Sequence, residues 1–305
     1  LRLKREHAIE TGIVERMYDL KRGITETFIK EGFVQSYMSH GDTNISETKL
    51  IEHLTDHLDA IDFVFDIVNE NRSITIGFIK ELHSLVTRHQ ESAEGRDQFG
   101  TKLQITLLRG KFKEHDNNPT RSNGTVIQYC PPEHVAAEMD NLIQIYDSLL
   151  SNDTHPLVCA AWFHHAFTTI HPFQDGNGRL ARLLSSLILI KNGFFPFTVL
   201  REEAKVKYIE ALEQADKGFP QKLIDYFIEV QKRNIEKALN LKEVTSSSYD
   251  EVTEIFSNKV RGWRQKQQRE KEEKLTTNRL IVFGFCKSYL EETINHLQDR
   301  LNGNI

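Results

Sequence analysis

Apolar residues recur at three- and four-residue spacing through most of the chain, and runs that alternate apolar with polar residues are few. This period places the apolar side chains on one face of a helix and predicts an all-α protein with little sheet. The spacing, with turn and cap residues at the ends, predicts helices over 5–18, 21–33, 46–70, 75–90, 132–150, 155–169, 178–191, 202–215 and 220–240.

The helical pattern stops between Gly110 and Pro132, where polar and turn-forming residues dominate. Within this stretch Asn123-Gly124 precedes the extended-type residues 125–129. Asn-Gly beside such residues is typical of a tight β-turn, so we expect a β-hairpin here. The pattern changes again after about Lys237, with a Ser-rich joint at 245–248 and a charged or polar run at 265–274. We expect separate helices in this tail.

Composition narrows the class of protein and its partners. The chain has 305 residues, of which 39 are basic and 44 acidic, giving a net charge of -5. This balance predicts no general attraction to nucleic acid or to an anionic membrane. The longest apolar run, 183–190, is too short to cross a bilayer, and the charged start, 1–6, is unlike a signal peptide. Cys130, Cys159 and Cys286 lack the paired spacing of a zinc site, so we expect thiols in a reducing cytoplasm.

The segment from His171 to Arg182 concentrates residues suited to phosphate chemistry, just ahead of the most apolar predicted helix. Gly176 and Gly178 allow close approach of a ligand to the backbone, and the free N–H groups of a helix N-terminus favour an anion. Arg179 and Arg182 are three residues apart, so we expect both guanidinium groups on one side of the first turn, binding phosphate oxygens.

Two further residues of the segment complete this chemistry. Asp175 offers a hard oxygen ligand where Mg²⁺ bridging two phosphates would lie. His171 can accept a proton near neutral pH. Taken singly, each of these residues is more often an ordinary turn, surface or core residue; their order within twelve positions favours a nucleotide site.

These twelve residues resemble the signature of the Fic family, His-Pro-Phe-x-(Asp/Glu)-Gly-Asn-Gly-Arg-x-x-Arg, at every specified position. The resemblance extends upstream to His164, Phe167 and Ile170, and to a flap-like region at 110–113 followed by Pro131-Pro132. It covers roughly residues 75–232. It implies a Fic fold, a helical bundle core with a small β-hairpin flap, to which N- and C-terminal helical extensions are added.

The resemblance also implies an activity and a domain plan. Members of this family transfer AMP from ATP with Mg²⁺ to a Ser, Thr or Tyr hydroxyl of a target protein and release pyrophosphate. We therefore expect a protein adenylyltransferase (AMPylation) with ATP and Mg²⁺ as cofactors, a target protein as partner, and a homodimer as one option. The expected domains are an N-terminal helical region at 1–72, a catalytic domain at 73–235 and a C-terminal extension at 236–305.

Site roles follow from the resemblance residue by residue. His171 would deprotonate the target hydroxyl, and Asp175 would hold Mg²⁺. The remaining expected contacts are Gly176, Asn177 and Gly178 for the anion hole, Arg179 and Arg182 for the β- and γ-phosphates, Thr125, Val126 and Ile127 for pairing with a target segment, and Tyr208 and Asp216 for the nucleobase. The last position departs from the Asn expected in the family.

Many proteins of this family are similar in carrying an inhibitory helix with Ser/Thr-x-x-x-Glu-Gly/Asn, whose glutamate pairs with the second motif arginine. Thr11 to Arg16 matches this pattern except at its last position, where Arg16 replaces Gly or Asn. The sequence 27–32 matches in full but has Lys30 where an apolar residue is usual. We expect Glu15 to be the inhibitory residue, with Glu31 as the alternative.

Two other readings stay open. The same scaffold could use another phosphate-linked donor or remove AMP, although Arg179 and Arg182 together favour a triphosphate donor. Alternatively, the chain could be a catalytically silent nucleotide-binding or scaffolding module. The presence of His171 favours an enzyme, because a protein that only binds nucleotide needs no base.

Overall fold

The computed structural model describes residues 1–96, 101–119, 124–244, 269 and 272. The chain forms two compact units, Leu1–Ser248 and Tyr249–Ile305. Everything below concerns the first unit. The predicted joint at 245–248, nearly all of the predicted tail beyond it, Cys286, and the Asn123 of the predicted turn lie outside the described residues.

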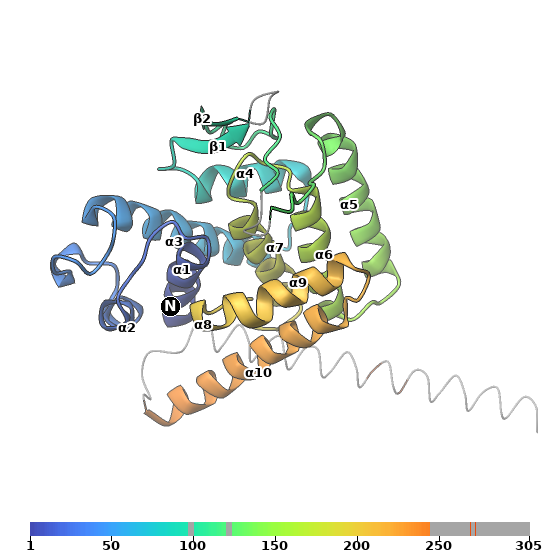
Figure 1. The fold of residues 1–305 in the computed structure, drawn as a ribbon. Helices are drawn as coiled ribbons and strands as arrows, with labels where there is room; N and C mark the ends of the chain where they lie inside the picture. The colour runs from blue at the N-terminus through green and yellow to red at the C-terminus, as the bar shows by residue number, and fades with distance from the viewer. Residues whose placement is uncertain (97–100, 120–123, 245–268, 270–271, 273–305) are drawn as a thin grey trace, which may run out of the picture. The chain divides into compact units, whose positions relative to one another are not determined.

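The first unit is all-α apart from one small sheet, which confirms the predicted fold class. Figure 1 shows the α-helices, which are α1 (Arg2–Val14), α2 (Arg22–Glu31), α3 (Glu47–Asn69), α4 (Ile76–Val86), α5 (Val135–Ser151), α6 (Pro156–Ile170), α7 (Asn177–Lys191), α8 (Arg201–Glu203), α9 (Ile209–Asp216) and α10 (Gln221–Val244). Short 3₁₀ turns lie at η1 (Gln35–Tyr37) and η2 (Pro132–His134). The helix predicted over 202–215 is instead interrupted by a π-helical turn, η3 (Ala204–Tyr208).

Local capping explains where several helices begin. The Ser46 hydroxyl accepts a hydrogen bond from the Lys49 N–H at the start of α3, and Thr75 accepts one from the Phe78 N–H at the start of α4. Each bond satisfies a backbone donor that has no partner within its own helix. Pro156, at the first position of α6, has no N–H to satisfy.

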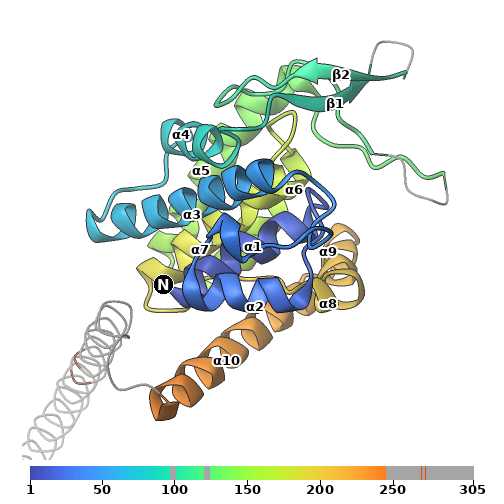
Figure 2. The same cartoon turned by 90° about the vertical axis from the view of Figure 1, so that its left-hand side faces the viewer.

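Helix α7 lies at the centre of the unit and packs beside α6, α3 and α4. From Leu180 to Ile190 every side chain of α7 is buried, including the two serines. A helix that is buried all round must be covered on every side, and α1 and α3 cover one of these sides (Figure 2). The N-terminal helix is therefore part of the shell around α7. Among the described residues, no helix is both long enough and apolar enough to cross a bilayer.

The small sheet lies earlier in the chain than predicted. Strands β1 (Ser92–Arg96) and β2 (Lys102–Thr106) pair antiparallel, with Ser92 opposite Thr106. The polar-apolar alternation of 102–106 is the sequence signal for this strand.

The predicted hairpin over 125–129 forms no strand; within its described part only Val126 takes part in a single bridge. Here the Asn118 side chain accepts from the Tyr129 N–H, at 2.8 Å, and the Ile127 N–H donates to the Pro119 carbonyl, at 3.0 Å. Residues 118–119 and 127–129 are therefore joined by one side-chain bond and one backbone bond instead of a regular strand ladder.

Candidate active site

The loop 171–176 joins α6 to α7 and is held by its own side chains. His171 ends α6 with a left-handed backbone (φ 53°, ψ 58°), and Gly176, at φ 81°, precedes the first residue of α7. Asn177 is 1% exposed; its Oδ1 accepts from the Phe173 N–H at 2.9 Å, and its Nδ2 donates to the Phe173 carbonyl at 2.7 Å. Asn177 thus fixes the loop through its side chain, in addition to any backbone contact with a ligand.

His171 is held in one tautomer. Its Nδ1 lies 3.1 Å from the Thr168 carbonyl oxygen. A carbonyl can only accept, so Nδ1 carries the proton and the lone pair lies on Nε2. The Tyr129 ring stacks on the imidazole, with centroids 3.8 Å apart. Burial lowers the pKa of His171 to about 4, so the ring is neutral at pH 7 and able to accept a proton.

The N-terminus of α7 faces a carboxylate from the N-terminal helix. A side-chain carbon placed on Gly178 would lie 2.3 Å from the Glu15 Oε1 atom, so only glycine permits this approach. Glu15 Oε1 also accepts from Arg182 Nη2 at 2.6 Å. Arg182 is 1% exposed and makes two further bonds to Thr11, from Nε to Oγ1 at 3.2 Å and from Nη2 to the carbonyl at 3.3 Å. A carboxylate therefore lies at the helix N-terminus, where the dipole favours an anion.

The other candidate inhibitory residue is elsewhere. Glu31 ends α2 and pairs with its exposed neighbour Lys30, at 3.6 Å. The residue in contact with Arg182 is thus Glu15. Arg16, which departs from the inhibitory pattern, has a positive φ of 57°. Glycine and asparagine tolerate this conformation best, which gives a physical reason for the usual Gly or Asn.

Arg179 and Arg182 take their partners from different elements, which differs from the expectation that both guanidinium groups lie on one side of the first turn. Arg179 is also 1% exposed; its Nη1 donates to the Val86 carbonyl at 3.2 Å and its Nη2 to Gln90 Oε1 at 2.6 Å. A side-chain carbon on Gly176 would lie 3.3 Å from Arg179 Nη2. The two side chains diverge toward these partners, and Arg179 also borders Gly176.

Asp175 is held ionised beside Arg179. Although burial opposes the charge, Arg179 and the hydrogen bonds from Gln90 and Gly176 keep the pKa of the carboxyl below its usual range. Gln90 Nε2 donates to Oδ2 at 2.6 Å, and the Gly176 N–H donates to Oδ1 at 2.5 Å. No group of three His, Cys, Asp or Glu side chains suited to a metal occurs within the described part of the chain. A single carboxylate still fits Mg²⁺, which keeps waters and is completed by substrate phosphates.

Comparisons with known proteins identify the domain that carries the loop. Residues 73–189 match the family described as Fic/DOC. They form a Fic domain. The chain is 29% identical over 192 residues to a protein adenylyltransferase Fic of Nematostella vectensis, covering 62% of this chain and 40% of that protein. It is 40% identical over 92 residues to a Fido domain-containing protein of Dictyostelium discoideum, covering 30% of this chain and 64% of that protein. The chain thus spans less than two thirds of either relative.

Solved structures agree on the fold of the Fic domain. A Fic domain containing signaling protein from Bacteroides thetaiotaomicron superposes with a TM-score of 0.65 at 23% identity, covering 80% of this chain and 88% of that one. Fic-1 from C. elegans superposes with a TM-score of 0.57 at 21% identity, covering 79% of this chain and 63% of that one.

The remaining predicted site residues lie at two places, of which the second is outside the segment 73–189. In the flap region, Thr125 and Val126 are exposed and Ile127 is half-buried. At the other place, the Tyr208 hydroxyl lies 2.8 Å from His164 Nε2, and Asp216 Oδ1 lies 2.9 Å from His165 Nε2. Tyr208 and Asp216 thus both contact α6, and Tyr208 is only 5% exposed.

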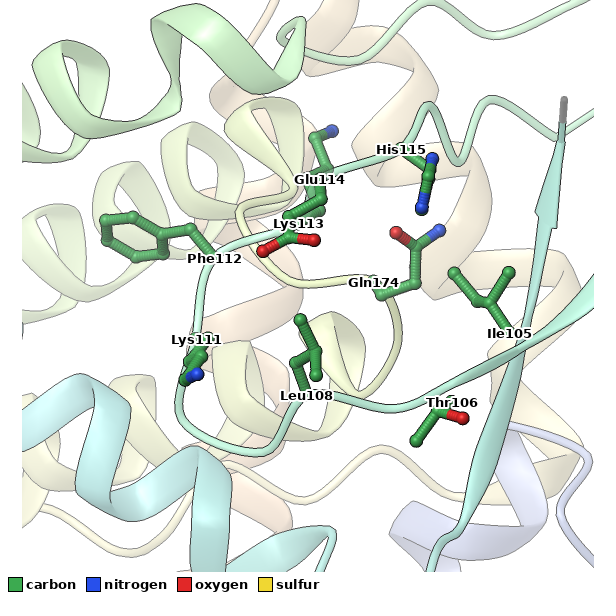
Figure 3. Close-up of a pocket in the computed structure, with 9 residues that line it drawn as sticks. All are labelled: Ile105, Thr106, Leu108, Lys111, Phe112, Lys113, Glu114, His115 and Gln174. Carbon is green, nitrogen blue, oxygen red and sulfur yellow. The ribbon is translucent and has the colours of Figure 1, made fainter. Parts of the chain in front are cut away.

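A small cavity of about 180 Å³ adjoins the loop of the Fic domain on its flap side (Figure 3). Gln174 of the loop and His115 of the flap segment point toward each other across it. Ile105 of β2 and Leu108 of the segment after it also line the cavity. The cavity is too small for a nucleotide and lies beside the loop that carries His171.

Several residues that support the loop of the Fic domain are not predicted from the sequence. His83 Nδ1 accepts from the Gly110 N–H at 2.8 Å, so its Nε2 carries the proton donated to the Asp175 carbonyl at 3.0 Å. Its ring stacks on Phe173, with centroids 3.9 Å apart. Burial lowers the pKa of His83 to about 4 and keeps it neutral in this role.

On the flap side, the Lys113 N–H donates to the Pro172 carbonyl at 2.9 Å, and Asn117 Nδ2 donates to the Phe173 carbonyl at 2.8 Å. Lys113 is 4% exposed, and burial lowers the pKa of its ammonium to about 8. A single histidine, lysine or asparagine carries no sequence signal for such roles, because its partner loop lies tens of residues away.

Proposed function

We propose that this protein transfers AMP from ATP to a Ser, Thr or Tyr hydroxyl of a target protein, in a cytoplasmic setting. The observation that carries the proposal is the tautomer of His171. Its Nδ1 proton is engaged by Thr168, so Nε2 is the acceptor, and it belongs to the loop that leads into an anion-favouring helix N-terminus. A base beside a phosphate site is the minimum that transfer of a phosphorus group to a hydroxyl needs.

In the proposed reaction, His171 Nε2 takes the proton of the target hydroxyl. The hydroxyl oxygen forms a bond to the α-phosphorus as the bond to the β-phosphate bridging oxygen breaks, and pyrophosphate leaves. The N–H groups of Asn177 and Gly178 bind phosphate oxygens. Gly176, whose own N–H donates to Asp175 Oδ1, completes the anion hole by permitting close approach of the ligand. Arg179 and Arg182 balance the charge of the leaving group. Asp175 would hold Mg²⁺, which neutralises phosphate charge when bound.

We further propose that Glu15 inhibits this transfer. Its carboxylate accepts a hydrogen bond from Arg182 and lies against Gly178, where a side-chain carbon would collide with it. This is the N-terminal end of α7, which favours an anion. A triphosphate that used Arg182 would have to displace this carboxylate. In this proposal residues 1–72 regulate and residues 73–235 catalyse. The flap residues Thr125, Val126 and Ile127 meet the target by strand addition. Tyr208 and Asp216 remain the proposed nucleobase contacts.

Incubation with ATP labelled in its α-phosphate tests the proposal. We expect label on protein with Glu15→Gly and Mg²⁺, and none when His171→Ala is added. A control with label in the γ-phosphate should stay unincorporated, because pyrophosphate leaves. Nucleotide binding without incorporation would instead indicate a binding module, and incorporation only from a different phosphate-linked donor would indicate another transferase. Loss of AMP from a modified protein would indicate the reverse reaction.

A further inference from the structure

The Gln90 side chain joins the two charged residues at the start of the anion site. Its Nε2 donates to Asp175 Oδ2 at 2.6 Å, and its Oε1 accepts from Arg179 Nη2 at 2.6 Å. A carboxylate can only accept and a guanidinium can only donate, so one orientation of the amide satisfies both. Gln90 is therefore a neutral bridge between an anion and a cation.

This bridge occupies the place of a direct ion pair. Asp175 and Arg179 are four residues apart, a spacing that favours direct pairing, yet Asp175 Oδ1 and Arg179 Nη2 are 3.8 Å apart. A direct pair with two parallel hydrogen bonds would take a lone pair from each carboxylate oxygen. Because Oδ1 already accepts from the Gly176 N–H, it would then have none left. With the bridge, each oxygen has one short bond, from Gln90 or from the Gly176 N–H, and keeps a lone pair for a further ligand.

The backbone around Gln90 is fixed independently of this bridge. The Gln90 N–H donates to the Thr87 carbonyl at 3.0 Å. Arg109 donates from Nε to the same carbonyl at 3.1 Å and from Nη2 to the Gln90 carbonyl at 3.2 Å. Gln90 Nε2 also donates to the Ser92 carbonyl at 3.2 Å, where β1 begins. The amide is thus held in place before any ligand arrives, which lowers the entropic cost of binding.

We propose that Gln90 is a positioning residue that orients Asp175 toward a divalent metal and keeps it from pairing directly with Arg179. The inference rests on the proposed function, in which Asp175 is the metal ligand. Hydrogen-bond partners of a ligating group commonly change metal affinity by about 10- to 100-fold when they are removed. The role belongs to the side-chain amide, because the backbone of Gln90 has its own partners.

Metal affinity measured without turnover tests this role. Gln90→Met keeps the length of the side chain and removes both hydrogen bonds. In a Glu15→Gly background saturated with α,β-methylene ATP, we expect the Kd for Mn²⁺, followed by electron paramagnetic resonance, to rise about tenfold. The matched control is Glu91→Gln, an exposed neighbour that should leave the Kd within twofold. An unchanged Kd in Gln90→Met would overturn the inference.

The Mg²⁺ dependence of AMP transfer separates positioning from a general structural role. We expect Gln90→Met to need about tenfold more Mg²⁺ for half-maximal rate and to approach the parent kcat at saturating Mg²⁺. A lower kcat with unchanged Mg²⁺ dependence would contradict positioning. Gln90→Asn, whose amide is one methylene too short to reach both partners, should behave in the same way if Gln90→Met does not fold.

The parent of these variants, Glu15→Gly with Gln90 intact, distinguishes this inference from the proposed function. A parent that binds Mn²⁺ with the analogue but transfers no AMP would overturn the proposed function alone, since the Kd comparison with Gln90→Met remains valid. A parent that binds the analogue but no Mn²⁺ would overturn both.

Discussion

Arg179 and Arg182 differ in where their partners come from, although both are buried and only three residues apart. Arg179 is bound within the Fic domain, by the Val86 carbonyl and by Gln90. Arg182 is bound by α1, through Thr11 and Glu15, across more than 160 residues of chain. Arg179 is therefore held by the catalytic domain itself, whereas Arg182 loses its partners if helix α1 moves.

This difference indicates how an inhibitory contact can be added to a catalytic loop without a change in the loop itself. Because Glu15 is 28% exposed at its side chain, its bond to Arg182 can be exchanged for another anion from solvent. The Arg179 bond to the Val86 carbonyl is buried and its bond to Gln90 is partly buried, and both partners belong to the same domain as Arg179.

Removal of Arg179 should destabilise the protein more than removal of Arg182. Arg179→Met leaves the buried Val86 carbonyl and the Gln90 amide without their donor, which should cost about 3 kcal/mol of unfolding free energy. Arg182→Met leaves Glu15 unpaired but partly solvated and removes the donor to the Thr11 hydroxyl, while the Thr11 carbonyl keeps the Glu15 N–H. It should therefore cost less, about 1.5 kcal/mol. Urea unfolding at pH 7.5 measures both. Equal losses would mean that α1 is as integral to the site as α4.

Neutralising the inhibitory carboxylate should raise nucleotide affinity. In Glu15→Gln the charge that competes with phosphate is gone while the shape is kept, and we expect ATP with Mg²⁺ to bind about tenfold more tightly, or about 1.4 kcal/mol. Calorimetry measures the affinity. Glu31→Gln is the matched control, because Glu31 pairs only weakly with exposed Lys30. Tighter binding in both variants would argue against a specific role of Glu15.

How much of this could be predicted from the sequence depends on the distance between partners. The helices follow from the three- and four-residue period, and the loop chemistry follows from twelve adjacent residues. By contrast, Gln90 and His83 contact the loop across 85 and 92 residues, and nothing in their own neighbourhood indicates it. The hairpin predicted over 125–129 forms no strand there, because the Tyr129 N–H bonds to the Asn118 side chain instead of to a strand partner. Turn propensities do not predict such a contact.

The divergence of the arginines has a similar origin. A spacing of three residues predicts only that the two side chains leave the helix on neighbouring sides. Their directions are set by acceptors on α4 and α1, which the fold brings to either side of α7. Sequence spacing therefore predicts the residues of a site better than it predicts their partners.

Acid should loosen α1 through His7. This side chain is 1% exposed, its Nε2 lies 3.5 Å from the Ser186 hydroxyl of α7, and burial lowers its pKa to about 3. The folded state thus keeps His7 neutral, while the unfolded chain takes up a proton below about pH 6.5. The stabilisation is complete above pH 6.5 and falls as pH drops toward 3. Between pH 6.5 and 5.5 the loss should be about 1 kcal/mol for this group.

Urea unfolding at the two pH values measures this loss, with His7→Gln as the comparison. Other buried histidines of the unit, His57 and His164, also have a lowered pKa and add to the total, so the informative quantity is the difference in slope between the parent and His7→Gln. Parallel pH profiles would show that His7 does not link acid to stability.

The residue after Glu15 should set the strength of inhibition by a small amount. Arg16 is exposed and holds φ at 57°, which costs an ordinary side chain about 1 kcal/mol. Glycine removes this strain, but the greater freedom that it gives the unfolded chain offsets about half of the gain in stability. Arg16→Gly should therefore stabilise the end of α1 by about 0.5 kcal/mol and lower basal AMP transfer about twofold. Transfer assays with Arg16→Asn, which also tolerates this φ, should show the same direction, whereas faster transfer would mean that Arg16 itself helps to hold Glu15 in place.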